Sequence, residues 1–481
     1  MKNQASNYDE KLKFIYAPNV HLFAYSLHKD TKQDNLLWQE SNLLLSKLTQ
    51  KQLPLSDFNF SSTHRRRLLL PKNFLTNKLP LKSKVEWENS QLKITGFASP
   101  LQLEDSYCLS LNLRRPETEN GQKTSLVNVN FYSKFNPGNC LIFKDDKQLF
   151  LGETLLITGW LTPEQKQYSR QNNNFFKDLA TDCVKALIPE RKKRPSFYRQ
   201  GELFGSPIFA YGLPSQEANT PQILVWFFLQ PETNQKFVTC SEQLFDLFFF
   251  QHKAIKAFQN SRVIYNVLAE KLTEIEEDAN QFQGINTRNK YLSNRELKIL
   301  QDKLQKLPKD ALGFAENLRL LSAYENTISL NQHNYREKLA QISENVGEKD
   351  LSFLADFEQK SCIIFRDQIQ GDLNYFVPGV GLVDRAIASI RGLVEIDQAE
   401  SDRQLNLTVA MLGVGIAAGG IFATSYALSV NEAIQLPNLS LPLKPLHPVT
   451  KSFLWSMAIG IFAAILTGII MGCWEKWRKR R

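Results

Sequence analysis

In the first half of the chain, hydrophobic residues recur with the period of two that is typical of strands. SYCLSLNLR (106–114) alternates apolar and polar positions, and LVNVNFY (126–132) repeats the pattern. LKITGF from Leu92 and TLLITGWL from Thr154 predict two further strands. ILVWFFL (223–229) is a continuous apolar run, which predicts a strand that is buried on both faces.

Helical patterns are interleaved with these strands. DNLLWQESNLLLSKLTQ from Asp34 and NFFKDLATDCVKALI from Asn174 carry apolar residues at helical spacing. The sequence therefore predicts a mixed α/β (α+β) region over 1–188 that continues, with the buried strand, over 196–245. The basic stretch PERKKRPSFYR (189–199) predicts a junction between two lobes.

From residue 246 to 376 the pattern predicts a helical bundle or coiled coil. Five hydrophobic residues recur every seven positions: Phe314, Leu321, Ile328, Tyr335 and Ile342. Leu318 and Leu339 share a second seam with Glu325 and Gln332, which favours an antiparallel bundle over a strict two-stranded coiled coil. Pro308 is expected to end or kink the helix before this heptad.

Two uncharged segments close the chain. Pro378 is expected to break the preceding helix, and a stalk helix is predicted over 379–403. It would continue into 404–431, about 28 residues without charge or about 42 Å of helix, and a second such segment covers 452–474. Both exceed the roughly 30 Å of a bilayer's hydrocarbon core, which predicts two transmembrane helices.

The charges beside these segments predict an orientation. The tail at 475–481 holds five basic residues, and the loop at 432–451 holds two lysines, so the tail should face the cytoplasm and the loop the outside. No secretory signal is seen at the N-terminus. The resulting prediction is an integral membrane protein with two spans and cytoplasmic N- and C-termini.

This layout resembles the CorA family of divalent cation channels. The resemblance lies in a cytoplasmic α/β domain, long helices, a stalk helix entering the first of two spans, and a basic tail. It implies a homopentamer whose first span lines a pore with a Gly-Met-Asn signature at its outer end. That signature is absent from TSYALSVNEA (424–433), so the resemblance does not carry magnesium selection over to this chain. The segment 390–406 also looks like that of uncharacterised cyanobacterial membrane proteins.

Three sets of residues are candidates for a site in such an assembly. A cation-attracting ring below the membrane would comprise the carboxylates Glu395, Asp397, Glu400 and Asp402. The polar pore lining would be Asn406, Thr408, Thr424 and Ser425. Small residues at helix-packing distance are Gly415, Gly419, Gly460, Ala464, Gly468 and Gly472. In a single protomer the carboxylates would instead form a solvated stalk surface.

The remaining composition changes this picture little. The net charge of +9 is spread over runs such as 64–72 and 189–199, which are typical of solvated linkers, so no nucleic acid partner is expected. Six scattered cysteines indicate reduced thiols and no zinc site. The six histidines form no HxxH or HExxH pair, and the chain has no GxSxG or phosphate-loop motif, so neither a cofactor nor catalysis is predicted.

Two interpretations of function remain open. One is an oligomeric, CorA-like cation channel or transporter, with membrane lipid, further copies of this chain and a divalent cation as partners. The other is a membrane-anchored scaffold or sensor whose spans tether and oligomerise a cytoplasmic binding domain. Which metal would be bound is unknown in either case.

Overall fold

A computed structural model describes residues 12–28, 36–49, 52–53, 66–68, 78–143, 149–213, 221–285, 294–428 and 448–478. The strands are β1 Phe14–Leu27, β2 Arg66–Leu68, β3 Leu79–Trp87, β4 Ser90–Leu103, β5 Ser106–Arg114, β6 Thr118–Glu119, β7 Gln122–Lys123, β8 Val127–Asn128, β9 Phe150–Trp160, β10 Phe197–Leu203, β11 Ser206–Tyr211 and β12 Gln222–Phe228. The α-helices are α2 Leu36–Thr49, α3 Pro163–Ser169, α4 Phe175–Leu187, α5 Pro231–Ile285, α6 Asn294–Val346, α7 Ser352–Asp356, α8 Cys362–Leu428 and α9 Pro448–Arg478. Shorter turns of helix are η1 Val129–Phe135, η2 Pro137–Asn139, η3 Arg191–Lys193 and the π-helical η4 Phe357–Ser361.

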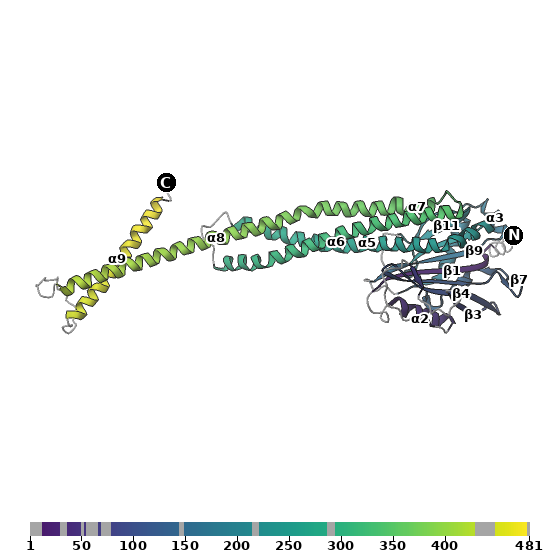
Figure 1. The fold of residues 1–481 in the computed structure, drawn as a ribbon, viewed down its shortest axis with the longest axis horizontal. Coiled ribbons are helices and arrows are strands. Elements are labelled where there is room, and N and C mark those ends of the chain that lie inside the picture. Colours follow the sequence, from purple (N-terminus) through teal and green to yellow (C-terminus); the bar gives the residue numbers. More distant parts are fainter. Residues whose placement is uncertain are drawn as a thin grey trace, which may run out of the picture. The chain divides into compact units, whose positions relative to one another are not determined.

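The chain divides into two units, which are described separately. Unit 1 comprises Met1–Leu272 and Phe314–Gly379, and unit 2 comprises Thr273–Gly313 and Val380–Arg481. The sheet and the sheet-bound part of the helices belong to unit 1 (Figure 1).

One mixed sheet organises unit 1. Its strand order is β10-β11-β12-β9-β1-β5-β4-β2, with β3 paired to β4 and β8 paired to β1. The pair β9–β12 is parallel, and the other pairs are antiparallel. Because β10 to β12 join the same sheet as β1, the junction predicted at 189–199 does not separate two lobes. Arg194 of that stretch instead donates to the carbonyl oxygens of Ile188 and Pro189.

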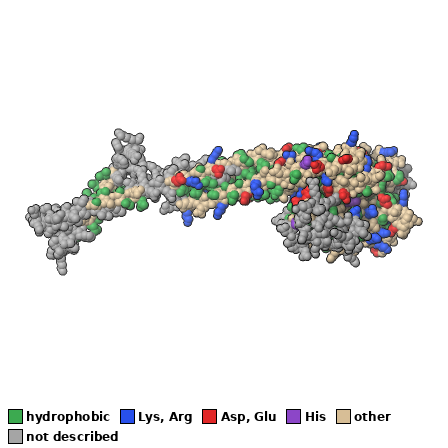
Figure 2. All heavy atoms as spheres, in the orientation of Figure 1, with side chains coloured by type: hydrophobic (Ala, Val, Ile, Leu, Met, Phe, Trp, Pro, Cys, Tyr) green, Lys and Arg blue, Asp and Glu red, His purple; other side chains and the backbone are tan. Residues whose placement is uncertain are grey.

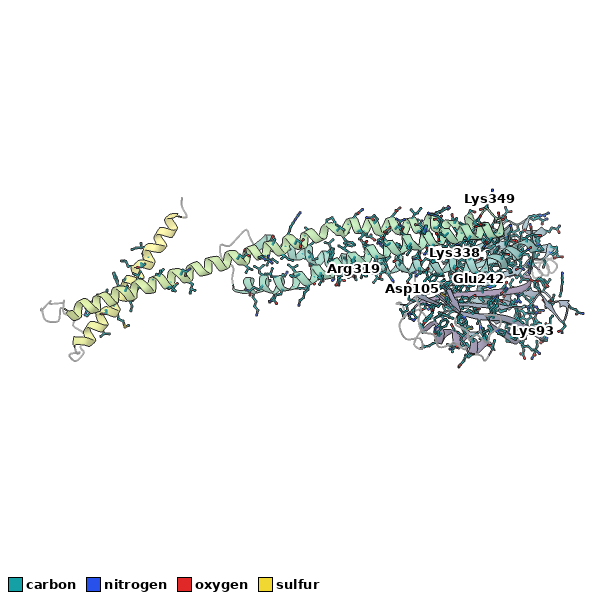
Figure 3. All side chains as sticks on the ribbon, in the orientation of Figure 1. Lys93, Asp105, Glu242, Arg319, Lys338 and Lys349 are labelled. Atoms are coloured by element: carbon teal, nitrogen blue, oxygen red, sulfur yellow. The ribbon has the colours of Figure 1, made fainter. Side chains whose placement is uncertain are left out.

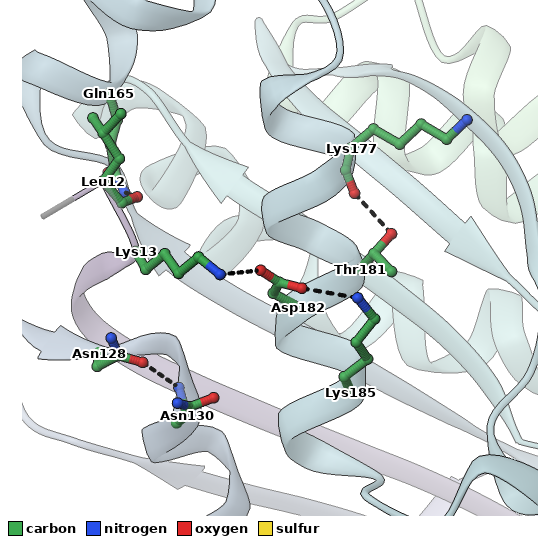
Figure 4. A network of polar contacts seen from close by, with 9 residues as sticks. All are labelled: Leu12, Lys13, Asn128, Asn130, Gln165, Lys177, Thr181, Asp182 and Lys185. Carbon is green, nitrogen blue, oxygen red and sulfur yellow. Dashed lines mark hydrogen bonds and ion pairs between the residues drawn. The ribbon is translucent and has the colours of Figure 1, made fainter. Parts of the chain in front are cut away.

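One face of the sheet packs against α2, α4 and η1. Val20, Leu22 and Ala24 of β1 point into this core, as do Leu109, Leu111 and Leu113 of β5, all nearly inaccessible to solvent. At its edge Lys13 and Lys185 lie on either side of Asp182, each with its Nζ 3.0 Å from a carboxylate oxygen (Figure 4). The Lys13–Asp182 pair joins α4 to the residue that precedes β1, and the Lys185–Asp182 pair lies within α4.

The opposite face of the sheet packs against the first half of α5. Aromatic rings make this contact: Phe23 of β1 lies against Phe245 and Phe248, and Tyr25 lies against Phe249. The Tyr25 hydroxyl also donates to the Phe245 carbonyl oxygen at 2.8 Å. Helices on both faces explain why β12, as predicted, is buried along almost its whole length.

Within unit 1, α6 and α8 extend the helical layer beside α5. The five predicted heptad residues of α6 are all at most 1% exposed, so that prediction is confirmed. The polar residues of the second seam, Glu325 and Gln332, form hydrogen bonds with α8 and with η4. Glu325 accepts from Arg366 Nε at 2.8 Å, and Gln332 donates to the Glu358 carbonyl oxygen at 2.7 Å. On the face shown in Figure 2, acidic and basic side chains are interspersed along the helices.

In unit 2, the beginning of α6 packs against the middle of α8. Leu300 and Leu307 are buried with Ala386 and Ile390, and Ile387 and Val394 pack against them. These α8 residues lie within 379–403, the range for which the sequence predicted a stalk helix.

Several local predictions were wrong. The stretch 126–132 forms strand only at Val127–Asn128 and then turns into η1, where the Asn128 side chain accepts from the backbone N–H of Asn130 at 3.0 Å (Figure 4). Pro308 does not end its helix, because α6 continues through it, and α8 likewise continues through Pro378, which was expected to break it. A separate stalk helix therefore does not begin at residue 379.

The two predicted transmembrane helices, 404–431 and 452–474, are also corrected. Crossing a bilayer takes about 20 consecutive, mostly apolar residues. In the ranges that the structure describes, no helix combines that length with that apolarity. This finding contradicts the predicted spans, the two-span membrane localisation with its cytoplasmic termini, and the ion-transport assignment that depended on them. Of the predicted loop at 432–451, residues 432–447 lie outside the described residues and residues 448–451 belong to α9.

Candidate ligand-binding cavity

The candidate site is a cavity of about 540 Å³ in unit 1. Its floor is formed by β4, β5, β1 and β9, and one wall is formed by the first turns of α5, from Asn234 to Phe245. It lies on the α5 side of the sheet. Glu242, labelled in Figure 3, belongs to this part of α5. The volume falls within the range of small-molecule sites, about 300–1,000 Å³.

The floor is polar because neighbouring strands place polar side chains at matching positions. In the sheet, Asn19 of β1 pairs with Arg114 of β5 and with Thr158 of β9, and His21 pairs with Asn112. Side chains at paired positions lie on the same face of the sheet, about 5 Å apart at their Cβ atoms. The polar positions of several strands therefore form one continuous patch under α5.

Asn112, which is 2% exposed, is the centre of this patch. Its Nδ2 donates to Asn19 Oδ1 at 2.5 Å and lies 3.2 and 3.3 Å from the two ring nitrogens of His21. If Asn112 Nδ2 lay in the plane of the His21 ring at these nearly equal distances from both ring nitrogens, it would collide with Cε1. The amide therefore lies over the face of the imidazole. The in-plane N–H and lone pair of His21 therefore stay available to a ligand.

His21 is neutral at physiological pH. Burial, with Arg114 and Lys78 nearby, lowers its pKa from 6.5 to about 3. A neutral imidazole offers one hydrogen-bond donor and one acceptor, whereas a protonated one offers two donors. The centre of the floor, at Asn19, His21 and Asn112, thus consists of uncharged groups, and the charges, Arg114 among them, lie around it.

Arg115 is the most unusual charged group of the cavity. It is 5% exposed, and its Nη2 donates to Ser125 Oγ at 2.9 Å. Its Nε and Nη1 have no hydrogen-bond partner among the described residues. Burial lowers the pKa of this guanidinium, and the charge of Glu119 opposes the shift. A buried guanidinium with two unpaired nitrogens destabilises the fold unless an anion or a water molecule accepts hydrogen bonds from those nitrogens.

The other four charges around the cavity balance one another, so the excess of positive charge equals one cation. Lys78 and Arg114 are cationic, Glu117 and Glu242 are anionic, and together with Arg115 the balance is three cations to two carboxylates. Glu117 accepts from Trp160 Nε1 at 3.1 Å, and Lys78 Nζ lies 4.2 Å from the centre of the Phe97 ring. The cavity therefore offers a neutral polar floor, aromatic walls and an excess of positive charge.

The carboxylates and pore-lining residues predicted from the sequence lie elsewhere, on α8 in unit 2. Glu395 is exposed, and the side chains of Asp397, Glu400 and Asp402 lie outside the described ones. Asn406 and Thr408 are exposed, whereas the side chains of Thr424 and Ser425 are not described. The proposed ring and pore lining, which need several copies of the chain, stay predictions.

One of the predicted packing glycines makes a close contact. A Cβ at Gly468 of α9 would lie 3.1 Å from the sulfur of Met411 in α8, so the missing side chain lets these two helices approach. Gly460 and Ala464 are half-buried. Gly415, Gly419 and Gly472 lie in helix whose side-chain surroundings are not described.

No metal site is found in the described part of the chain, where no three His, Cys, Asp or Glu side chains gather in a suitable group. Cys108, Cys140, Cys183, Cys240 and Cys362 are buried and form no disulfide with a described residue. Burial raises the pKa of Cys140 to about 11 and the pKa of Cys240 to about 12, so neither is poised as a nucleophile.

The cavity residues were missed in the sequence. The alternation in 106–114 places Ser110, Asn112 and Arg114 opposite the apolar side, a pattern normally assigned to solvent. One signal in the sequence was available. The corresponding face of β1 carries an asparagine, Asn19, and a histidine, His21, and a strand face that only contacts solvent does not require either residue. Only the strand pairing brings these residues together.

Comparison with known proteins returned no matching family model and no matching curated protein. One match among solved structures is the structure of the full-length CmaX protein, at 12% sequence identity and a TM-score of 0.18, covering 66% of this chain and 88% of CmaX. At that TM-score the match carries no argument about fold or function. The resemblance to the CorA family stays a prediction from the sequence.

Proposed function

We propose that this protein is a non-enzymatic binding protein whose cavity between the sheet and α5 takes a small anionic organic molecule. The observation that carries the proposal is the set of three cations in the cavity lining, Lys78, Arg114 and Arg115, of which Arg115 is a buried guanidinium. A carboxylate or phosphate oxygen is the partner that guanidinium nitrogens bind best. Arg114 and Lys78 would add to the attraction without being buried themselves.

The arrangement of the cavity favours binding over catalysis. Among the described residues, the only hydrogen-bonding group within reach of the His21 ring is the Asn112 amide, which is not a nucleophile. A hydroxyl or thiol nucleophile is activated by a hydrogen bond to a base, and His21 makes no such bond with a described residue. Since residues of α5 form one wall, a bound ligand would touch the helix that leads into the bundle, which favours a sensor.

Titration calorimetry of the full chain with a panel of small anions tests this function. Citrate, benzoate, hexyl phosphate and glucose 6-phosphate would be titrated separately. At least one is expected to bind saturably at one site per chain. Arg115→Met should weaken that binding at least tenfold, because a hydrogen bond to a charged group contributes about 1.5–3 kcal/mol.

Two further variants make the result interpretable. Arg114→Met removes a cation that is exposed at the cavity and should weaken binding without disturbing a buried group. Arg319→Met, on the exposed side of α6 (Figure 3), is the matched control and should leave the affinity unchanged. The proposal fails if no member of the panel binds, or if both cavity variants bind like the parent protein.

A further inference from the structure

The uncharged groups on the floor of the cavity indicate the chemistry of the ligand more closely than the net charge of the cavity does. Besides the pair Asn19–Asn112, it presents the hydroxyls of Ser110 and Thr158, which make no side-chain hydrogen bond to any described residue. The Nδ2 of Asn19 and the Oδ1 of Asn112 likewise have no partner in the described ranges. Floor groups of this kind are costly to dehydrate unless the ligand hydrogen-bonds to them.

The free groups are a mixture of donors and acceptors. The Asn19 amide donates, the Asn112 carbonyl oxygen accepts, and the hydroxyls of Ser110 and Thr158 do either. The neutral His21 ring adds one donor and one acceptor. A hydroxyl group donates and accepts at once, so a ligand with several hydroxyls matches this mixture, whereas an alkyl chain would leave it unsatisfied.

The walls differ from the floor. Phe97, Trp160 and Phe237 line the cavity from β4, β9 and α5. Aromatic faces of this kind pack against the C–H edges of a ring and exclude water. Two of the cations lie together in the same lining, where β5 ends at Arg114 and Arg115 follows it.

Resting on the proposed binding function, we infer that the ligand is a hydroxylated anion, a sugar phosphate or sugar acid. Its acidic group would pair with Arg115 and Arg114, its hydroxyls would bond to the floor of Asn19, Ser110, Asn112 and Thr158, and its ring would pack against the aromatic walls. The cavity of about 540 Å³ has room for one monosaccharide with its acidic group.

Calorimetry with matched probes tests this inference. Glucose 6-phosphate and hexyl phosphate carry the same acidic group, but only the first carries ring hydroxyls, and glucose carries the hydroxyls alone. We expect glucose 6-phosphate to bind at least tenfold more tightly than either of the others. A site built to hydrogen-bond hydroxyls discriminates strongly against analogues that lack them.

Variants of the floor supply a second readout. Ser110→Ala and Asn112→Leu should each lower the affinity for glucose 6-phosphate, by about threefold and at least tenfold, and change that for hexyl phosphate less than twofold. Ser110 is half-buried and makes no described side-chain hydrogen bond, so its variant should fold even if Asn112→Leu does not.

The outcomes separate the inference from the proposed function. Equal affinity for hexyl phosphate and glucose 6-phosphate, with both sensitive to Arg115→Met, overturns the hydroxylated ligand and leaves the anion-binding function standing. Binding of citrate or benzoate alone has the same meaning. Glucose binding as tightly as glucose 6-phosphate, or no binding by any probe, overturns the anion-binding function itself.

Discussion

Replacing Gly96 by alanine is expected to destabilise unit 1 by about 3 kcal/mol or more. A Cβ at Gly96 would lie 1.9 Å from the backbone oxygen of Asn112, 2.8 Å from its carbonyl carbon and 3.2 Å from the Cα of Leu113. These are backbone atoms of the neighbouring strand β5, so no side chain can rotate to make room. Either β4 or β5 would have to shift, and the sheet pairing between them would be strained.

Urea unfolding followed by tryptophan fluorescence measures this effect. Gly371→Ala is the matched control, because a Cβ at Gly371 in α8 would meet nothing within 4 Å. An alanine there should stabilise the helix by about 0.5–1 kcal/mol. A Gly96→Ala protein whose unfolding free energy lies within about 0.5 kcal/mol of the parent would contradict the described packing of β4 on β5.

The same contact connects the fold to the cavity. The backbone of Asn112 packs against Gly96, and its side chain forms the centre of the cavity floor. A shift of β5 would therefore move the Asn112 amide away from Asn19 and His21. Among Gly96→Ala molecules that still fold, ligand binding should be weaker than the loss of stability alone predicts.

Much of the sheet could be predicted from the sequence because its hydrophobic pattern is strict. The alternating stretch 106–114 and the apolar run 223–229 became β5 and the buried strand β12. In 126–132 the same period of two failed beyond Asn128. There the Asn128 side chain caps a 3₁₀-helix, and Phe131 and Tyr132 are buried in the core in that conformation instead.

The prolines show why local rules are overridden by packing. Pro378 and Gly379 together resemble a helix end, yet α8 continues through them. A Cβ at Gly379 would lie 2.9 Å from Leu272 and 3.3 Å from Phe314, so this glycine allows three helices to approach one another. The packing of these helices compensates for the hydrogen bond that proline removes.

The cavity could not be predicted, since it is assembled from five elements far apart in the chain. His21 and Asn112 are separated by 91 positions, and their contact depends on the pairing of β1 with β5. In the sequence each is only a polar residue in a half-buried strand. The sequence-based site prediction was directed to the acidic residues 395–402 because those lie close together along one helix.

Lowering the pH from 7 to 5 is expected to cost unit 1 about 2 kcal/mol for each of two histidines, the buried His252 and the half-buried His21. Burial lowers the pKa of His252 from 6.5 to about 3, and burial with the nearby cations does the same to the pKa of His21. His252 is 5% exposed, and its Nε2 lies 2.8 Å from Thr154 Oγ1. A charged imidazole would be poorly accommodated at either position.

Whether stability rises or falls with pH depends on whether the folded or the unfolded chain binds the proton. Between pH 6.5 and 3 the unfolded chain binds a proton at each histidine and the folded chain does not, so stability falls as the pH falls through this window. The contribution is fully present above pH 6.5. Urea unfolding at pH 7, 6 and 5 measures it, and the loss should steepen below pH 6.5 for the parent protein.

His252→Gln and His21→Gln divide this loss between the two sites. A glutamine keeps a donor and an acceptor but does not titrate in this range, so each variant should reduce the difference between pH 7 and pH 5 by about 2 kcal/mol, and the double variant by about twice that. His252 lies outside the cavity lining, so its variant should keep the parent's ligand affinity, whereas His21→Gln should weaken it. Equal pH dependence in the parent and the double variant would show that neither histidine is held neutral in the folded state.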